Sequence, residues 1–176
     1  MKIFSDPHIQ IAGTKDIPAI KELLNSAYRG ESSRKGWTTE ADLIAGNVRT
    51  DEQNLSDVLA IPGSVFLKYT DEHGQVKGCV NLQVQKHRVY LGMFSVNPEL
   101  QGAGIGKIIL RSAEEYAKFQ GCTHIYMSVI SVRAELIAWY QRHGYVDTGE
   151  RKAFMEDGLT GKHLRELEFM TLEKRL

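Results

Sequence analysis

Three glycines stand within five positions in the stretch NPELQGAGIGKIIL, residues 97–110, directly before a run of helix-forming residues. Glycine weakens regular secondary structure by roughly 0.5–1 kcal/mol relative to alanine, so this cluster needs a physical reason. The free N–H groups at a helix N-terminus form a concave site for an anion, and glycine lets a phosphate approach without a Cβ atom in the way. The stretch therefore predicts an anion-binding loop that leads into a helix.

Two common nucleotide-binding loops do not fit the spacing of these glycines. The Walker pattern requires a glycine five residues before the Gly-Lys pair and a serine or threonine after it, but Gln101 and Ile108 occupy these positions. The dinucleotide fingerprint requires G-x-G-x-x-G, whereas this loop reads G-x-G-x-G. Neither nucleotide-binding pattern therefore explains the loop.

Apolar periodicity and turn residues predict an alternation of strands and helices around the loop. We expect strands over 9–13, 64–70, 76–85, 88–96, 123–131, 145–154 and 164–176, and helices over about 17–27, 39–45, 51–60, 105–120 and 133–143. The strand, glycine loop, helix and strand over 89–131 form a βαβ unit, so its two strands should be parallel. Gly92 inside a strand often marks a bulge or a close approach to the backbone. The expected architecture is a mixed α/β sheet with helices on both faces.

The glycine loop also contains the pattern Gln-x-x-Gly-x-Gly, at Gln101, Gly104 and Gly106. The preceding strand ends in Val96, and Pro98 follows two residues later. Together these features resemble the pyrophosphate loop of the GCN5-related N-acetyltransferase (GNAT) family, closely over residues 89–145 and loosely over the whole order of elements. The resemblance implies one domain over residues 1–176, with a mixed, mostly antiparallel sheet of about seven strands and a splayed parallel pair at the cofactor site.

The resemblance also implies acetyl-coenzyme A (acetyl-CoA) as co-substrate and indicates how the chain would hold it. The loop amides would bind the pyrophosphate. The pantetheine arm would lie between the two parting strands and bond to the backbone of Phe94 and Val96. The cofactor-binding residues expected on this basis are Phe94, Ser95, Val96, Gln101, Gly102, Ala103, Gly104, Ile105, Gly106 and Lys107.

Tyr140 is the expected catalytic residue. In the family, a tyrosine four residues before a glycine and an aromatic residue directs its hydroxyl at the thioester sulfur, and Tyr140, Gly144 and Tyr145 match this spacing. A phenol with a pKa near 10 stays protonated at neutral pH and can donate a proton to a departing thiolate. The alternative is that Tyr140 only packs in a helical stripe with neighbouring aromatic residues.

Arg133 departs from the family pattern. Many relatives have an asparagine seven residues before the tyrosine, where it helps to hold the pantetheine arm, and this chain has Arg133. The arginine can instead reach a carboxylate such as Glu135 or the coenzyme phosphates, or remain in solvent. The sequence leaves these alternatives open.

The polar segment over residues 28–40 covers the acceptor side in relatives, so we expect acceptor-binding residues there. The candidates are Tyr28, Arg29, Glu31, Trp37 and Glu40. Glu31 and Glu40 are candidates for the base that takes a proton from the attacking amine, while Arg29 or Arg34 can attract an acidic acceptor. The alternative for each carboxylate is a surface charge on a polar loop.

Composition narrows the class of partner. The 22 basic and 22 acidic residues give a net charge of zero, which argues against nucleic acid as the main partner. The histidines lack metal-ligand spacing, and Cys79 and Cys122 are interpreted as buried thiols. No apolar run approaches the ~18 residues of a spanning helix. We therefore expect a cytoplasmic protein without a metal or membrane partner, and a homodimer is compatible with the family.

Taken together, the sequence predicts an acetyl-CoA-dependent N-acetyltransferase. A primary amine of a small molecule or peptide would attack the thioester directly in a ternary complex, as the family resemblance implies. The alternative is a non-catalytic acyl-CoA-binding regulatory domain that has kept the cofactor loop and lost turnover.

Overall fold

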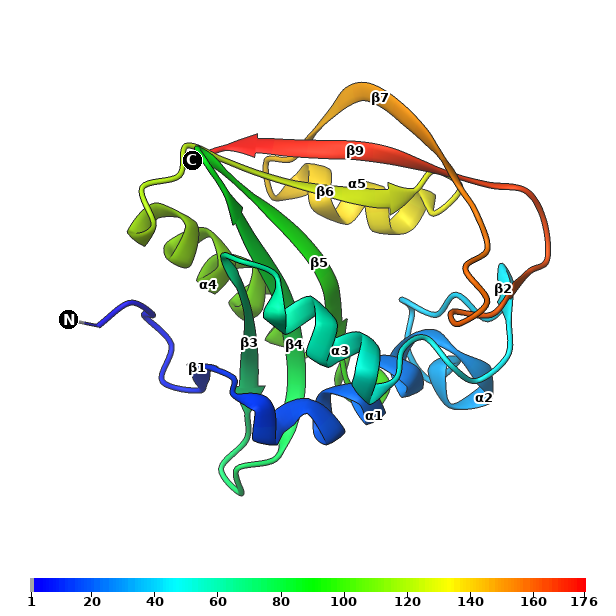
Figure 1. Ribbon diagram of the computed structural model, residues 1–176, viewed down its shortest axis with the longest axis horizontal. Coiled ribbons are helices and arrows are strands. Elements are labelled where there is room, and N and C mark those ends of the chain that lie inside the picture. Colours follow the sequence, from blue (N-terminus) through cyan, green and yellow to red (C-terminus); the bar gives the residue numbers. More distant parts are fainter. Residues whose placement is uncertain (1) are drawn as a thin grey trace.

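The computed structural model describes residues 2–176 and contains a central seven-stranded sheet with helices on both faces (Figure 1). The strands of this sheet are β1 (Ile9–Ile11), β3 (Ser64–Thr70), β4 (Val76–Gln85), β5 (Arg88–Val96), β6 (His124–Ile130), β7 (Val146–Phe154) and β9 (Leu167–Arg175). The helices are α1 (Ile17–Tyr28), α2 (Gly30–Ser33), α3 (Glu52–Ala60), α4 (Ile105–Phe119) and α5 (Ala134–Arg142), with two single 3₁₀ turns, η1 (Thr14–Asp16) and η2 (Pro98–Leu100). The predicted fold class is confirmed.

The strand order in the sheet is β1-β3-β4-β5-β6-β9-β7. The pair β5–β6 is parallel, as the βαβ unit predicts, and the other pairs in the sheet are antiparallel. The final strand β9 lies between β6 and β7. Two short strands outside the sheet, β2 (Ile44–Ala45) and β8 (Lys162–His163), pair with each other.

Alternation along the strands distributes the core over the two faces of the sheet, because successive side chains in a strand point to opposite faces. Phe66 and Cys79 pack in one apolar cluster with α1 and α3. Their chain neighbours Leu67 and Val80 pack in another cluster with α4 and α5. The helices α1, α3, α4 and α5 each contribute apolar side chains to these clusters, whereas the edge strand β7 is exposed along most of its length.

The parallel strands β5 and β6 separate halfway along their length. Their pairing runs only from Arg88↔His124 to Tyr90↔Tyr126. Beyond this point β6 continues to pair with β9 as far as Ile130↔Phe169, while β5 turns away from it (Figure 1). The predicted splay of this pair is therefore present, and it opens a notch in the middle of the sheet.

A bulge in β5 accompanies the separation. Asn81 pairs with Gly92, whereas Cys79 pairs with Ser95, so β5 has one more residue than β4 between these positions. Met93 adopts a positive φ of 50° inside this bulge, which is uncommon for a residue with a side chain. The irregularity that Gly92 suggested is present one residue further on, and it re-aims the end of β5.

The expected helix over 39–45 is wrong. The segment instead contains turns, in which the N–H groups of Leu43 and Ile44 both donate to the carbonyl of Glu40, and then the short strand β2. Ile44 is buried against Ile130 and Leu167, so tertiary packing fixes this segment. The helix predicted over 51–60 is present as α3, and its N-cap is Asp51, whose side chain accepts from the Asn54 N–H at 2.7 Å.

Candidate active site

Two neighbouring cavities lie at the notch between β5 and β6. The larger has a volume of about 550 Å³ and is lined by the glycine loop, the end of β5 and one face of α5. The smaller has a volume of about 130 Å³ and lies between β5, β6 and the segment that contains Glu40 and Arg49. Both cavities are lined by Tyr28, Phe94, Leu136 and Tyr140, so they meet at these side chains.

The glycine loop forms one end of the larger cavity and presents its amides there. Gly102 and Gly104 have φ values of 92° and 87°, and the space where a Cβ atom would stand is open at both. Among residues 101–107, the structure of residues 2–176 provides a hydrogen-bond acceptor only for the Ala103 N–H, which donates to the Leu100 carbonyl at 3.3 Å. The amides at the start of α4 are therefore available to a ligand.

The side chain of Gln101 holds this loop in place. Its Oε1 accepts from the Thr38 N–H at 3.1 Å, and its Nε2 donates to the Thr38 hydroxyl at 2.7 Å and to the Val96 carbonyl at 3.1 Å. The side chain also contacts Gly36, where a Cβ atom would collide with it. Gln101 thus ties the glycine loop to the segment 36–38 and to the end of β5.

The end of β5 offers both backbone and side-chain groups to the larger cavity. The Phe94 carbonyl accepts a hydrogen bond from the Tyr28 hydroxyl, and burial raises the pKa of this phenol, which keeps it a donor. Ser95 is 3% exposed, and its buried hydroxyl has no hydrogen-bond partner within residues 2–176. Buried hydroxyls are normally paired, so Ser95 has unused hydrogen-bonding capacity beside the cavity.

Tyr140 lies on α5 at the junction of the two cavities. It is buried, and its ring packs edge-on against Trp139 and Tyr145. Its hydroxyl forms no hydrogen bond with any of residues 2–176. Burial raises the pKa of the phenol, so the group remains protonated far above neutral pH.

Several residues of the larger cavity have no place in the sequence prediction. Trp139 lies 6.1 Å from the Phe94 ring and 4.3 Å from the His143 ring, measured between ring centroids. Trp139, Arg142 and His143 all line the larger cavity. The helical stripe around Tyr140, for which core packing was the alternative, therefore forms a wall of the larger cavity.

The five residues that the sequence suggested for acceptor binding do not all lie at the cavities. Tyr28 lines both cavities, Glu40 lines the smaller one and Trp37 lines the larger one. Arg29 is 1% exposed and lies behind Glu40. Glu31 lies outside both cavities on the exposed side of α2, where it pairs with Arg34.

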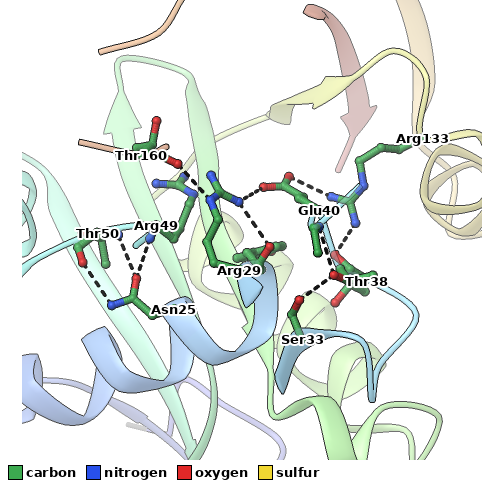
Figure 2. A network of polar contacts seen from close by, with 12 residues as sticks. Asn25, Arg29, Ser33, Thr38, Glu40, Arg49, Thr50, Arg133 and Thr160 are labelled. Carbon is green, nitrogen blue, oxygen red and sulfur yellow. Dashed lines mark hydrogen bonds and ion pairs between the residues drawn. The ribbon is translucent and has the colours of Figure 1, made fainter. Parts of the chain in front are cut away.

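A polar network joins Glu40 to arginines from distant parts of the chain (Figure 2). One carboxylate oxygen of Glu40 lies 2.6 Å from Nη1 of Arg29, and the other lies 3.1 Å from Nη1 of Arg133. Arg29 Nε also donates to the Thr160 carbonyl at 2.9 Å, and Arg133 donates to the Thr38 carbonyl. Arg133 therefore binds Glu40, and neither Glu135 nor solvent is its partner.

A mixed sheet that opens between two parallel strands, with a glycine loop at a helix N-terminus beside the opening, defines an α/β protein with a preformed cleft. Residues 17–145 match the sequence model of the acetyltransferase (GNAT) family. The chain belongs to the GNAT family.

Curated relatives share part of this sequence. N-acetyltransferase 8B from Homo sapiens is 26% identical over 125 residues, which are 67% of this chain and 53% of that protein. Streptothricin acetyltransferase from Streptomyces lavendulae is 30% identical over 70 residues, 40% of this chain and 37% of that protein. The spermine/spermidine N(1)-acetyltransferase of Bacillus subtilis is 34% identical over 64 residues, which are 36% of this chain and 42% of that protein. The chain spans about half or less of the length of these relatives.

Solved structures share the fold over almost the whole chain. The ribosomal-protein-S18-alanine N-acetyltransferase from Escherichia coli superposes with a TM-score of 0.69 at 16% identity, covering 95% of this chain and 92% of that chain. The ribosomal-protein-alanine N-acetyltransferase from Brucella melitensis gives a TM-score of 0.69 at 20% identity, covering 96% of this chain and 99% of that chain. Within residues 2–176, no helix combines the length and apolar character that crossing a membrane requires.

Proposed function

We propose that this chain is an acetyltransferase that moves an acetyl group from acetyl-CoA to a primary amine. The observation that carries this proposal is the pair of cavities that meet at Tyr140, with the glycine loop at the far end of the larger one. One cavity suits a long anionic ligand, and the other suits a small second reactant. Relatives named as amine acetyltransferases support the same reaction.

The residues present fit a coenzyme A molecule in the larger cavity. The amides at residues 104–107 have no acceptor within residues 2–176 and lie at the positive end of the α4 dipole. Lys107 and Arg142 line the same cavity and would add positive charge beside a pyrophosphate. The unpaired Ser95 hydroxyl and the backbone at the end of β5 would hold the arm that reaches into the notch.

Tyr140 is the proposed general acid. Acetyl-CoA supplies the acetyl group as a reactive thioester. The Tyr140 hydroxyl, free of protein partners and raised in pKa by burial, would hold a proton at the junction of the cavities and donate it to the departing sulfur. Positioned proton donors of this kind contribute about 10²–10⁴-fold in rate.

Glu40 is a poor candidate for the base that accepts the amine proton. Its two carboxylate oxygens are already paired with the guanidinium groups of Arg29 and Arg133, so neither oxygen is left free for an amine. Glu31 is exposed and lines neither cavity. We therefore propose that water in the smaller cavity takes the proton, or that the amine enters already neutral.

Release of free thiol from acetyl-CoA with a panel of amines tests the proposal, and calorimetry with coenzyme A measures binding separately. We expect submillimolar binding and amine-dependent thiol release. Binding of coenzyme A without release on any amine would instead favour the non-catalytic acyl-CoA-binding domain. If coenzyme A did not bind at all, the glycine loop would not be a coenzyme-binding site.

A further inference from the structure

The walls of the smaller cavity carry more positive than negative charge. The guanidinium groups of Arg29 and Arg133 pair with the single carboxylate of Glu40, and the guanidinium group of Arg49 lies on the other side of Arg29 (Figure 2). Three positive charges and one negative charge leave a formal excess of two. The charged side chains that line the cavity itself are Glu40, Arg49 and Arg133, and the remaining lining residues are neutral.

Arg49 is the member of this cluster without a carboxylate. Both oxygens of Glu40 are used by Arg29 and Arg133, and no carboxylate of residues 2–176 pairs with the Arg49 guanidinium. Its backbone is nevertheless fixed, because the Arg49 N–H donates to Asn25 Oδ1 at 2.6 Å. A partly buried cation held against a cavity without a counter-charge is energetically costly, and an anion in the cavity would remove this cost.

Arg29, which lies behind Glu40 and does not line the cavity, adds a further buried positive charge to the cluster. It is 1% exposed, and its Nη2 is buried without a hydrogen-bond partner within residues 2–176. Burial lowers the pKa of this guanidinium, the Glu40 carboxylate opposes that effect, and the nearby Arg49 lowers it further. The two arginines lie next to each other in Figure 2, so like charges meet where the protein supplies no second carboxylate.

From this arrangement we propose that the acceptor is a small amine that carries a carboxylate or another acid group within a few bonds of its nitrogen, and that Arg49 binds this acid group. The inference rests on the proposed function and names its substrate class. The cavity of about 130 Å³ has roughly the volume of four water molecules, which suits the acid-bearing end of an amino acid. Its boundary with the larger cavity at Tyr140 places the amine at the thioester.

The same charge distribution disfavours cationic acceptors. Additional ammonium groups, as in a polyamine, would meet the net positive charge of the arginine cluster and be repelled. The cluster would also lower the pKa of the reacting ammonium group, and so assist the loss of its proton. We therefore expect this chain to differ in substrate from its relative named as a spermine/spermidine acetyltransferase.

Matched acceptors test the inference. Thiol release would be measured with a set of amino acids, their carboxamides, the corresponding amines without the acid group, aminomethylphosphonate and spermidine. We expect kcat/KM to be roughly 10- to 100-fold higher for the acids than for their carboxamides, as expected for loss of a charge-assisted hydrogen bond. The ratio between carboxylate and phosphonate acceptors then identifies the acid group.

Arg49→Gln provides the matched variant. Its kcat/KM for acids should fall by roughly 10- to 100-fold, mainly through KM, while kcat/KM for carboxamides should change much less and the affinity for coenzyme A should stay the same. Arg34→Gln is the control, because Arg34 is exposed, pairs with Glu31 and Asp42, and lies outside both cavities. A ratio of acid to carboxamide that Arg49→Gln leaves unchanged would overturn the inference.

A measurement of acceptor binding tests this inference independently of the proposed acetyltransferase activity. Calorimetric titration of an amino acid and its carboxamide into the protein with coenzyme A does not depend on turnover. Equal turnover of acids and carboxamides, or a preference for spermidine, would overturn the inference and leave the acetyltransferase proposal standing. Acid binding that Arg49→Gln abolishes, without thiol release on any amine, would overturn the acetyltransferase proposal and leave the anion site standing.

Discussion

At the scale of single residues, the site depends on which polar groups are already paired and which are not. Glu40 and Gln101 look in sequence like groups that would meet a ligand, yet their side chains are fully engaged with other parts of the chain. Tyr140 and Ser95 have hydroxyls without partners within residues 2–176 and line the larger cavity. Unused hydrogen-bonding capacity therefore marks the groups that are free to act.

Tyr140→Phe tests the proposed proton donor at this scale. The ring and its contacts with Trp139 and Tyr145 remain, so the fold and the affinity for acetyl-CoA should be unchanged. Loss of the hydroxyl should lower kcat by about 10²–10⁴-fold, because it removes an interaction needed only when the sulfur departs. Steady-state kinetics at saturating coenzyme measure this effect. If kcat equalled that of the unmodified protein, Tyr140 would serve only in packing and not as a proton donor.

At the scale of elements, the start of α4 decides whether a diphosphate can bind. Gly102 and Gly104 have positive φ values, so any side chain there strains the backbone. Gly106 differs from them, because a Cβ atom at this position would make ordinary contacts of 3.7–3.8 Å with Phe94, Trp139 and Val96. A substitution at Gly106 thus changes the cavity without distorting the loop.

Gly106→Glu places a carboxylate beside the free amides of α4, and Gly106→Ala is the matched control. We expect the glutamate variant to weaken coenzyme A binding by at least about 100-fold through steric overlap and charge repulsion, and the alanine variant to bind within about threefold of the original. Calorimetry measures both affinities, and thermal unfolding verifies the fold. If the two variants bound coenzyme A with equal affinity, the coenzyme would not bind at the start of α4.

The Gln101 side chain links segment 36–38 to the end of β5, so its removal should lower the stability of the fold. Gln101→Ala leaves the Thr38 N–H and the Val96 carbonyl without the partners they now have, so we expect a loss of about 1–3 kcal/mol in the free energy of unfolding. Urea unfolding monitored by circular dichroism measures it. Gln53→Ala, on the exposed face of α3, should cost less than about 0.5 kcal/mol. Equal costs for the two substitutions would show that the link to segment 36–38 does not stabilise the fold.

At the scale of the whole molecule, a buried ion pair connects the N-terminal region to the sheet and gives stability a pH dependence. Asp16 and Lys68 lie 2.9 Å apart, and each side chain is 12% exposed. Burial alone would raise the pKa of the Asp16 carboxyl, but the hydrogen bonds from Lys68 and from the Gly13 N–H outweigh it, so the pKa lies below its ordinary value. A depressed pKa in the folded state stabilises the protein above the pKa of the unfolded chain.

Asp16→Asn tests this linkage. The contribution of Asp16 is fully present above about pH 4, near the pKa of an unfolded aspartate, and is lost as the pH falls through the lower folded pKa. The variant should therefore lose about 1 kcal/mol at pH 7, and the difference should shrink towards pH 3. Urea unfolding at both pH values measures it, with the exposed Asp57→Asn as control. A difference that does not depend on pH would contradict the assignment.

The sequence was sufficient for elements whose signals are local. The apolar spacing of Ile17, Ile20 and Leu24 located α1, and the glycines of the loop located the start of α4. The splay of β5 and β6 followed only from the family resemblance, because no residue within either strand determines where their pairing ends. Gly92 pointed to the bulge, but Met93 carries the positive φ.

The segment over residues 29–50 could not be predicted, because its conformation depends on distant partners. Arg29 contacts Thr160, and Glu40 contacts Arg133, at separations of 131 and 93 residues. Ile44 packs against β6 and β9. A helix over 39–45 fits the local sequence, but these contacts are satisfied only by turns and a short strand. The arginine cluster was therefore invisible without the tertiary structure.

The position of β9 also has a consequence for how the sheet is completed. β9 is the last strand in chain order, yet it lies between β6 and β7 and pairs with both. During synthesis from the N-terminus, β7 has no hydrogen-bonded neighbour in the sheet until residues 167–175 have emerged, because β7 pairs with β9 and not with β6. The wall of the notch formed by β6 thus gains its second hydrogen-bonded edge only once β9 has been synthesised, and a nascent chain that lacks residues 167–175 would be exposed to proteases and to wrong strand pairing.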